Sequence, residues 1–446
     1  MSFFIRSTLS IFFLLAFSAA AVQAQEADLK PEHRAELIND VSNLLTEHYV
    51  FADVGEDMVT LINSKLKQGD YEQFTSVSAM AHQLTQDLQS ISHDLHLHVD
   101  AAEAPPMEQG SSEVDEAAIQ QRRLANARFN NFGFERLEIL PGNVGYLELR
   151  SFASASIGGE TAVAAMNFLA NSSAIIFDLR QNGGGDPSMI QLLSSYLFEE
   201  PEHLNSFYIR ATDSTEQYWT QASVRGPKMP DTPVYILTSR RTFSAAEEFT
   251  YNLRNMERAT IVGETTGGGA HPVDFHFSDM GDGHYASMSI PYGRAINPIT
   301  GTNWEGTGVE PHIKASADNA LQVAHIDILK NLVADETNPE RLFSYQWAME
   351  ELENRLNPLP ADQSSFEAYT GQFGPRKIFT RNGEMFYQRG EGVAHKLRAM
   401  GDKDRFMVGE LDFFRIQFER NDSGDIAVLT GQYSSGRTDR NARSDG

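Results

Sequence analysis

Apolar residues in the first part of the chain recur at helical spacing. Within residues 32–66 and 77–88 they lie three or four positions apart, as Leu37, Val41, Leu44 and Leu45, and then Met80, Leu84 and Leu88. Such spacing places side chains on one face of a helix. The pattern predicts a small helical N-terminal domain over residues 25–100.

The apolar period changes to two residues over 92–99. Apolar residues at positions 95, 97 and 99 alternate there with Asp94, His96 and His98. This alternation is typical of a strand, in which successive side chains point to opposite faces. It predicts that His96 and His98 share one face of that strand.

A change of composition follows this segment. Residues 101–116 are rich in Ala, Pro, Ser, Glu and Gly, and a helix is expected to follow through Ala127. Such a composition is typical of exposed connections between domains. We therefore place a linker over residues 101–128.

Strand-like and helix-like segments alternate over residues 136–313. The strand-like segments are 144–149, 174–179 and 234–237, and the helix-like segments are 160–169, 188–198 and the stretch after Ser244. Alternation of this kind predicts an α/β core with a largely parallel sheet. We assign this core to residues 129–318.

The C-terminal third changes character twice. Residues 320–333 and 341–356 have helical periodicity, which predicts a helical connection over 319–360. Short alternating strands and turn signals such as Asn382-Gly383 then predict a β-rich accessory domain over 361–433. The Ser-, Gly-, Arg- and Asp-rich tail 434–446 is expected to be disordered.

Residues 1–24 have the features of a secretory signal peptide. Arg6 precedes the largely apolar run 11–22, and Val22-Gln23-Ala24 resembles a cleavage site. A membrane anchor is the alternative, but the run is shorter than a bilayer span. We expect a periplasmic or secreted protein with no stable membrane span after the signal is removed. The chain has no cysteine, so disulfides cannot stabilise it.

The charge balance restricts the partners. Thirty-six basic and 61 acidic residues give a formal net charge of -25. A charge of this sign repels phosphate backbones and anionic lipid surfaces. Nucleic acid is therefore not expected as a partner.

The segment R-T-F-S-A-A-E, from Arg241 to Glu247, joins a predicted strand to a predicted helix. This layout would place the Ser244 hydroxyl at a helix N-terminus, where amide N–H groups and the helix dipole can stabilise an oxyanion. S-A-A-E is also a capping box, in which Ser244 and Glu247 satisfy each other's amides. The segment alone is compatible with a nucleophile and with a cap.

Two glycine-rich turns also follow predicted strands. They are D-L-R-Q-N-G-G-G-D at 178–186 and G-E-T-T-G-G-G-A at 263–270. Glycine allows close approach of the backbone, so such a turn can direct an amide at a substrate carbonyl. A phosphate cradle is a weaker alternative, because neither turn has the lysine or the glycine spacing of nucleotide loops. A purely structural turn is also compatible with these residues.

Three of these segments together carry a family resemblance. In order, D-L-R-Q-N-G-G-G, T-S-R-R-T-F-S-A-A-E and V-G-E-T-T-G-G-G-A resemble motifs of the tricorn/C-terminal-processing-protease family of serine peptidases. The branch most similar to them is that of the interphotoreceptor retinoid-binding protein and tricorn core domains. The resemblance extends from about Leu37 to Ser316. It implies a crotonase/ClpP-like α/β core and peptidase activity.

The resemblance assigns the nucleophile and the oxyanion hole. The serine of the family's T-x-S-A-x-E motif corresponds to Ser244, and the amides of Ala245 and Gly184 correspond to the two oxyanion donors. The C-terminal-processing branch has a lysine at the position of Gly269, so no Ser-Lys dyad is expected.

The tricorn branch instead implies a histidine and a glutamate. Asp94-Leu95-His96 and the segment from Trp304 to Pro311 resemble its two sites, which assigns His96 and Glu305. Tricorn has a serine directly before its histidine, where this chain has Leu95. His98 and Ser92 are nearby residues that could replace that serine.

These residue types suit nucleophilic catalysis. A serine hydroxyl is a weak nucleophile at neutral pH and needs an adjacent base such as an imidazole. A carboxylate that orients this imidazole also stabilises its cation. We expect a serine peptidase that acts on a peptide or protein substrate through Ser244, His96 and Glu305, without a cofactor.

Two other functional classes remain open at this stage. His93, His96 and His98 lie close together and could bind zinc, although the chain lacks H-E-x-x-H at these residues. Members of the retinoid-binding branch use this fold to carry apolar ligands. The second alternative is therefore a non-catalytic carrier.

Overall fold

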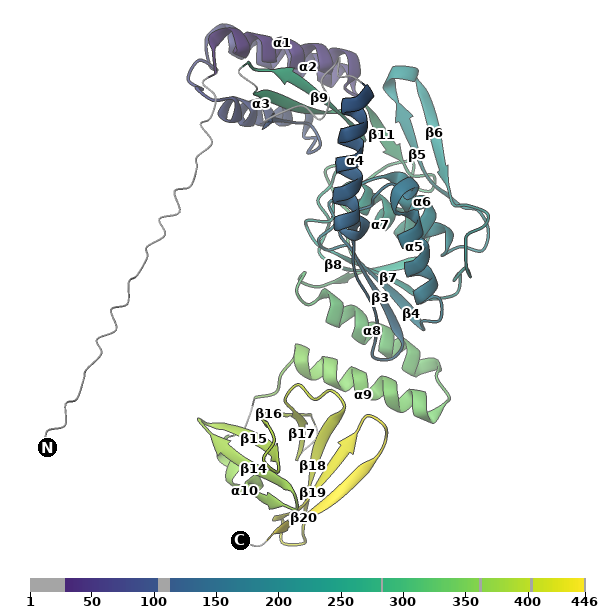
Figure 1. Cartoon of the computed structure of the whole chain (residues 1–446), viewed down its shortest axis with the longest axis vertical. Coiled ribbons are helices and arrows are strands. Elements are labelled where there is room, and N and C mark those ends of the chain that lie inside the picture. Colours follow the sequence, from purple (N-terminus) through teal and green to yellow (C-terminus); the bar gives the residue numbers. More distant parts are fainter. Residues whose placement is uncertain (1–28, 103–112, 282–283, 361–362, 402–403, 445–446) are drawn as a thin grey trace, which may run out of the picture.

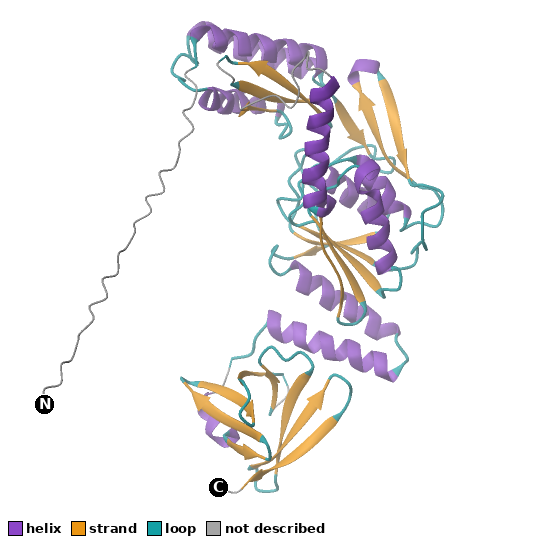
Figure 2. Cartoon of the chain, viewed as in Figure 1, coloured by secondary structure: helices purple, strands orange, loops and turns teal. Residues whose placement is uncertain are grey.

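The computed structural model describes residues 29–102, 113–281, 284–360, 363–401 and 404–444. The chain forms a helical part, a central sheet with flanking helices, and a C-terminal barrel, which follow one another along the long axis of the molecule (Figures 1 and 2). This architecture confirms the predicted fold class. The predicted signal peptide, residues 1–24, lies outside the described residues.

The N-terminal part combines three helices with strands from distant sequence. The helices are α1 (Pro31–His48), α2 (Ala52–Gln68) and α3 (Val77–Ser92). Strand β1 (His98–Ala102) pairs with β10 (Tyr285–Pro291), which pairs with β9 (Val273–Asp279). One apolar cluster joins Leu84 of α3 to Met288 and Ile290 of β10. The helical domain expected over 25–100 is thus completed by residues 273–291, because its apolar helix faces need a covering layer.

The strand predicted over 92–99 is wrong over residues 92–97. Helix α3 ends at Ser92, His93 adopts a left-handed conformation with φ 55°, and β1 begins only at His98. Between them lies a turn in which Leu97 N donates to the Asp94 carbonyl oxygen at 3.2 Å. The turn reverses the expected exposure, since Leu95 is 48% exposed while His96 is buried.

Helix α4 (Glu113–Phe129) occupies much of the predicted linker. It agrees with the helix expected through Ala127 and lies alongside the central part of the molecule (Figure 1). Residues 103–112 of the linker lie outside the described residues. A short 3-10 turn, η1 (Asn131–Gly133), leads from α4 into the central sheet.

The central sheet has six strands in the order β12-β8-β7-β4-β3-β2. The strands are β2 (Phe134–Leu140), β3 (Val144–Leu149), β4 (Ala174–Asp178), β7 (Val234–Thr238), β8 (Ala259–Gly263) and β12 (Ile313–Lys314). Only β2 is antiparallel to its neighbour. This confirms the predicted, largely parallel sheet.

Helices cover both faces of this sheet. Helices α5 (Ala155–Leu169), α6 (Pro187–Ser195) and α7 (Ala245–Asn255) pack on the face that carries Ile175 and Phe177, and α8 (Ala320–Asp335) packs on the face that carries Ile176. Successive residues of a strand thus point into the apolar clusters on opposite faces of the sheet. Both faces are covered, so the sequences of these strands are continuous apolar runs.

A smaller sheet stands beside this core (Figure 2). Its order is β11-β5-β6, and its strands are β5 (His203–Ile209), β6 (Ser214–Trp219) and β11 (Gly293–Ile296), with the 3-10 turn η2 (Arg210–Thr212) between β5 and β6. All neighbours in it are antiparallel.

The C-terminal part is a closed barrel of strands β13 to β20. Helix α9 (Pro339–Leu356), the 3-10 turn η3 (Gln363–Ser365) and helix α10 (Phe366–Tyr369) precede it. The strands are β13 (Gly371–Phe373), β14 (Arg376–Arg381), β15 (Glu384–Arg389), β16 (Ala394–Ala399), β17 (Arg405–Val408), β18 (Phe414–Arg420), β19 (Ile426–Tyr433) and β20 (Thr438–Ser444). The predicted Asn382-Gly383 hairpin turn is confirmed, with positive φ at both residues.

The disorder predicted for the tail 434–446 is wrong over β20. This strand pairs with β19 on one side and with β13 on the other, and so closes the barrel. The polar composition of β20 does not indicate a strand, because β20 is held by backbone hydrogen bonds rather than by apolar side chains. Its pairing on both sides leaves the barrel without a free edge. Residues 445–446 lie outside the described residues.

Helix α9 attaches the barrel to the rest of the chain. The guanidinium of Arg415 in β18 lies 3.7 Å from the centroid of the Trp347 ring and donates to Glu350 at 2.5 Å. Among the described residues, no helix has both the length and the apolar character that crossing a membrane requires.

Candidate active site

The three sequence motifs meet at one edge of the central sheet. Each follows the carboxyl end of a parallel strand: residues 179–186 follow β4, residues 239–244 follow β7, and residues 264–270 follow β8. Thr242 links them, since its hydroxyl donates to the Leu179 carbonyl at 2.8 Å and its carbonyl accepts from Gly267 N at 3.0 Å. Functional groups of α/β sheets collect at this edge, so the motifs form one site.

Ser244 occupies a rare backbone conformation at the start of α7. Its φ of 54° and ψ of -124° are unusual for a residue with a side chain. The residue is half-buried, and the amide of Ala245, the first residue of α7, has no intrahelical acceptor. The serine hydroxyl is therefore presented beside the positive end of a helix dipole.

Glu247 joins the serine to the third motif. Its buried carboxylate accepts from Ser244 N at 3.0 Å, from Gly268 N at 2.7 Å and from Gly269 N at 2.8 Å, and also from the Thr266 hydroxyl. Burial raises the pKa of Glu247, and these hydrogen bonds oppose that shift. The capping-box pair is present, and it also holds the Gly-rich turn against Ser244.

Gly184 packs directly against the serine. A Cβ atom at this position would lie 2.8 Å from the Ser244 Cβ and 3.1 Å from Ala245 N, and Gly184 has a φ of +112°. The first motif, residues 178–186, therefore needs glycine at position 184 for close approach to Ser244. The Gly184 amide, however, donates to Asn182 Oδ1 at 2.8 Å. The structure thus gives this predicted oxyanion donor a partner within its own turn, as is common two residues after asparagine.

His96 packs against the segment that carries Ser244. Its ring packs against Phe243, the residue before Ser244, with 4.5 Å between the ring centroids. A Cβ atom on Gly269 would lie 2.5 Å from its Cε1 atom, so this turn also closes tightly around the imidazole. Burial lowers the pKa of His96 to about 4, although the charge of Asp94 acts in the opposite direction. The imidazole is therefore neutral at neutral pH.

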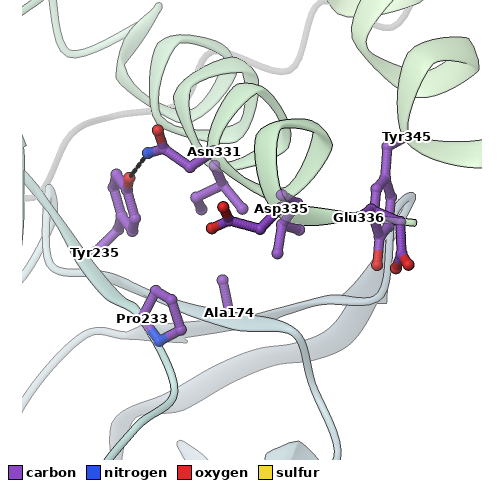
Figure 3. A pocket seen from close by; sticks show the side chains of 9 residues that line it. Ala174, Pro233, Tyr235, Asn331, Asp335, Glu336 and Tyr345 are labelled. Carbon is purple, nitrogen blue, oxygen red and sulfur yellow. Dashed lines mark hydrogen bonds between the residues drawn. The ribbon is translucent and has the colours of Figure 1, made fainter. Parts of the chain in front are cut away.

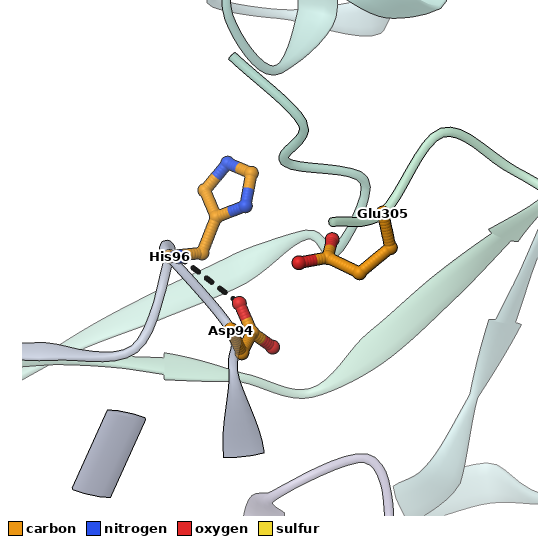
Figure 4. Close-up of side chains that lie close together, drawn as sticks. All are labelled: Asp94, His96 and Glu305. Carbon is orange, nitrogen blue, oxygen red and sulfur yellow. Dashed lines mark hydrogen bonds between the residues drawn. The ribbon is translucent and has the colours of Figure 1, made fainter. Parts of the chain in front are cut away.

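The structure brings Glu305 and Asp94 close to His96. One polar side-chain atom of each residue lies within 4.8 Å of the other two, and Figure 4 shows the Glu305 carboxylate directed toward the other two side chains. Burial raises the pKa of Glu305 to about 7, His271 lowers it and Asp94 raises it. The cluster thus combines a neutral base with a carboxyl group that titrates near neutrality.

No hydrogen bond yet connects these groups into a relay. Within the described part of the chain, both ring nitrogens of His96 and the Oε1 atom of Glu305 are buried without a hydrogen-bond partner. His96 is therefore bonded neither to Ser244 nor to Glu305. The other oxygen of Glu305 accepts from Ala270 N at 2.6 Å, which fixes the carboxylate to the third motif.

Sequence reasoning missed a second histidine in this cluster. His271 Nδ1 lies 2.6 Å from Asp94 Oδ2 and 3.5 Å from Glu305 Oε2. Burial lowers the pKa of His271, but the hydrogen bond and charge of Asp94 outweigh this and raise it. Asp94 also accepts from His96 N at 3.0 Å. The sequence position of His271 could have indicated its place in the site, because it directly follows the motif that ends at Ala270.

The remaining candidates near His96 have other contacts. His98 Nδ1 lies 2.9 Å from the His96 carbonyl oxygen, and the Ser92 hydroxyl accepts from Asp94 N at 3.2 Å. His93 caps the end of α3. Only His98 belongs to β1, so His93, His96 and His98 do not share the strand face on which a zinc site of these three histidines was considered.

A cavity of about 240 Å³ lies elsewhere on the core (Figure 3). It is lined by Ala174, which begins β4, by Pro233, which precedes β7, and by Asp335 at the end of α8. Because these strand positions are at the amino ends of β4 and β7, the cavity lies at the edge opposite Ser244. It contributes no residue to the cluster around His96.

Two family models match the chain. The model of peptidase family S41 matches residues 143–315 and therefore includes Ser244, Glu305 and the three motifs. The model described as the N-terminal domain of Peptidase_S41 in eukaryotic IRBP matches residues 28–128, which include His96.

Several solved structures are similar to the chain at low identity. The photosystem II D1 C-terminal processing protease is 14% identical, with a TM-score of 0.39 over 64% of this chain and 94% of that one. Mature CPAF complexed with lactacystin is 12% identical, with a TM-score of 0.49 over 68% of this chain and 98% of that one. The tricorn protease is 14% identical, with a TM-score of 0.40 over 73% of this chain and 37% of that one.

Proposed function

We propose that the chain, which belongs to peptidase family S41, is a serine peptidase with Ser244 as nucleophile, His96 as general base and acid, and Glu305 as the group that orients His96. The observation that carries this proposal is the neutral, buried imidazole of His96 between the residue before Ser244 and the Glu305 carboxylate.

Acylation would proceed by two proton transfers and the exchange of a C–N bond for a C–O bond. His96 takes the proton of the Ser244 hydroxyl while the oxygen attacks the carbonyl carbon of the scissile peptide bond. The imidazolium then gives this proton to the departing amine, and the C–N bond breaks. Water repeats the sequence on the acyl-enzyme and releases the second product.

Substrate binding would have to complete the relay. His96 makes no hydrogen bond to Ser244 in the free chain, and catalytic hydrogen bonds are often long before substrate binds. A rotation of the imidazole would let one ring nitrogen face the hydroxyl and the other face Glu305. When His96 becomes a cation, its charge favours the ionised form of Glu305. The Glu305 carboxylate then stabilises the imidazolium.

The oxyanion would be held by Ala245 N and by a second amide. Ala245 begins α7, so its amide has no intrahelical acceptor. Gly184 N is the proposed second donor, and substrate must share or displace its hydrogen bond to Asn182. The loss of one such donor typically costs about 10²- to 10³-fold in kcat.

We also propose that the protein acts outside the cytoplasm, on the basis of the signal-like residues 1–24. Peptides or proteins of the periplasm or the surroundings would then be its substrates. N-terminal sequencing of the exported protein tests this. A mature N-terminus near Gln25 is expected, and retention of residues 1–24 in the cytoplasm would contradict export.

Covalent labelling tests the catalytic proposal. A fluorophosphonate probe should modify the wild-type protein, and Ser244→Ala should abolish labelling while the protein remains folded. Digestion of a peptide library by wild type and not by Ser244→Ala would establish the peptidase reaction. Absence of labelling together with tight binding of an apolar ligand would contradict the proposal and favour a carrier.

A further inference from the structure

We propose that Asp94, His96 and Glu305 also bind a Zn²⁺ ion, and that this ion inhibits the peptidase. The binding site is argued from the side chains alone. The inhibition rests on the function proposed above, because it requires His96 to be the base.

The donor set suits zinc. An imidazole nitrogen and two carboxylate oxygens lie within 4.8 Å of one another, and they come from a turn after α3 and from a loop more than two hundred positions later. Zinc binds histidine nitrogen and carboxylate oxygen, and three protein ligands with a fourth position open to water are a usual zinc coordination. Two carboxylates would also neutralise the charge of the ion.

Unpartnered atoms line this site. His96 is 7% exposed, and neither of its ring nitrogens has a hydrogen-bond partner among the described residues. The Oε1 atom of Glu305 is likewise buried without a partner. Burial of polar atoms without partners is unfavourable, so a cation that binds one ring nitrogen of His96 and the Oε1 atom of Glu305 would remove part of that cost.

Modest side-chain movement would bring the ligands to bonding distance. Zinc binds nitrogen and oxygen at about 2.0–2.2 Å, so its ligands must approach one another more closely than the present 4.8 Å limit. Rotation of the Glu305 and His96 side chains can supply this, since their facing atoms hold no hydrogen bond. Figure 4 shows both side chains extending into the same space.

Outer contacts orient the two carboxylates. His271 holds Asp94 at 2.6 Å, and Ala270 N holds the Oε2 atom of Glu305 at 2.6 Å. The Oε1 atom of Glu305 is left to the metal. Hydrogen bonds of this kind fix metal ligands, and losing one typically weakens metal binding by about 10- to 100-fold.

Inhibition follows from the shared imidazole. With zinc on the ring nitrogen that faces Glu305, the other ring nitrogen carries the hydrogen of the neutral imidazole and has no lone pair to accept the proton of Ser244. Zn²⁺ would therefore compete with acylation without contacting the serine.

Calorimetric titration of Zn²⁺ into tag-free Ser244→Ala protein tests the site without any activity. One ion per chain is expected. Glu305→Gln and His96→Gln should each weaken binding at least tenfold, and His271→Gln by about 10- to 100-fold. His98→Gln is the matched control, since His98 lies two positions away and is not part of the cluster. Absence of binding, or binding that depends on His98 instead, would overturn the site.

The labelling rate of wild type with a fluorophosphonate probe tests inhibition separately. Zn²⁺ at saturating concentration should slow labelling at least tenfold, and a chelator should restore the rate. Binding without any slowing would overturn the inhibitory part. No labelling in the absence of zinc would contradict the proposed peptidase and leave the calorimetric result standing.

Discussion

The carboxylate of Asp94 and the imidazole of His271 form a buried pair 2.6 Å apart, beneath the loop that carries Glu305. The two residues are 177 positions apart in the chain. Asp94 also accepts the backbone N–H of His96, so this pair connects the turn that carries His96 to the third motif. We regard Asp94 and His271 as positioning residues.

Asp94→Asn should lower kcat by about 100-fold, because displacement of a catalytic group by about 1 Å has an effect of that size. The asparagine side chain is uncharged, and its NH₂ group cannot accept, so one of the two carboxylate oxygens that receive His96 N and His271 is lost as an acceptor. KM should change little, since substrate contacts are kept. Asp100→Asn, an exposed carboxylate of β1, is the matched control. Equal kinetics for both variants would contradict the positioning role.

Gly184→Ala should abolish fluorophosphonate labelling. The added methyl would lie 2.8 Å from the Ser244 Cβ, at a φ of +112° that disfavours alanine. Gly183→Ala is the control, because a Cβ there meets no atom within 4 Å. Circular dichroism should show both variants folded. Normal labelling of Gly184→Ala would show that the turn does not close on Ser244.

Glu247→Gln should destabilise the core by about 1–3 kcal/mol, the cost of leaving a buried donor unsatisfied. The Glu247 carboxylate accepts from three amides, and the glutamine NH₂ group can accept from none. Urea unfolding measures the change. Glu340→Gln, at an exposed helix start, should change stability far less. Similar unfolding midpoints for the two variants would contradict a stabilising role of the Glu247 hydrogen bonds.

Glu248 should make the stability of the fold fall as the pH rises from about 4 to about 8. It is 3% exposed on α7, and burial raises its pKa to about 8. The folded-state pKa exceeds the unfolded value of about 4.3, so its contribution is complete below about pH 4 and is lost as the pH rises through 8. Glu248→Gln should remove this loss.

Melting temperatures between pH 5 and pH 9 provide the test. The wild type should lose stability relative to Glu248→Gln as the pH rises across this range. Two parallel curves would mean that Glu248 does not titrate in the folded chain.

Apolar periodicity and the order of the motifs were sufficient to predict most of the central sheet and its helices. The strands near 144–149, 174–178 and 234–238 agree with the apolar runs, because both faces of a parallel sheet are covered. The Asn382-Gly383 turn was equally local, since both residues tolerate positive φ. In these places a short stretch of chain contains the information that decides its conformation.

Long-range contacts decided the rest. The alternation over 92–99 predicted a strand, but the turn at Asp94 is stabilised by His271 and Tyr49, which no local pattern reveals. The polar residues of β20 predicted disorder, and pairing with β13 and β19 made them a strand. The chain by itself therefore determined its helices, its parallel strands and the place of Ser244 between β7 and α7. Only the tertiary structure decided which carboxylates and imidazoles meet beside it, because hydrogen bonds between buried side chains depend on distance in space.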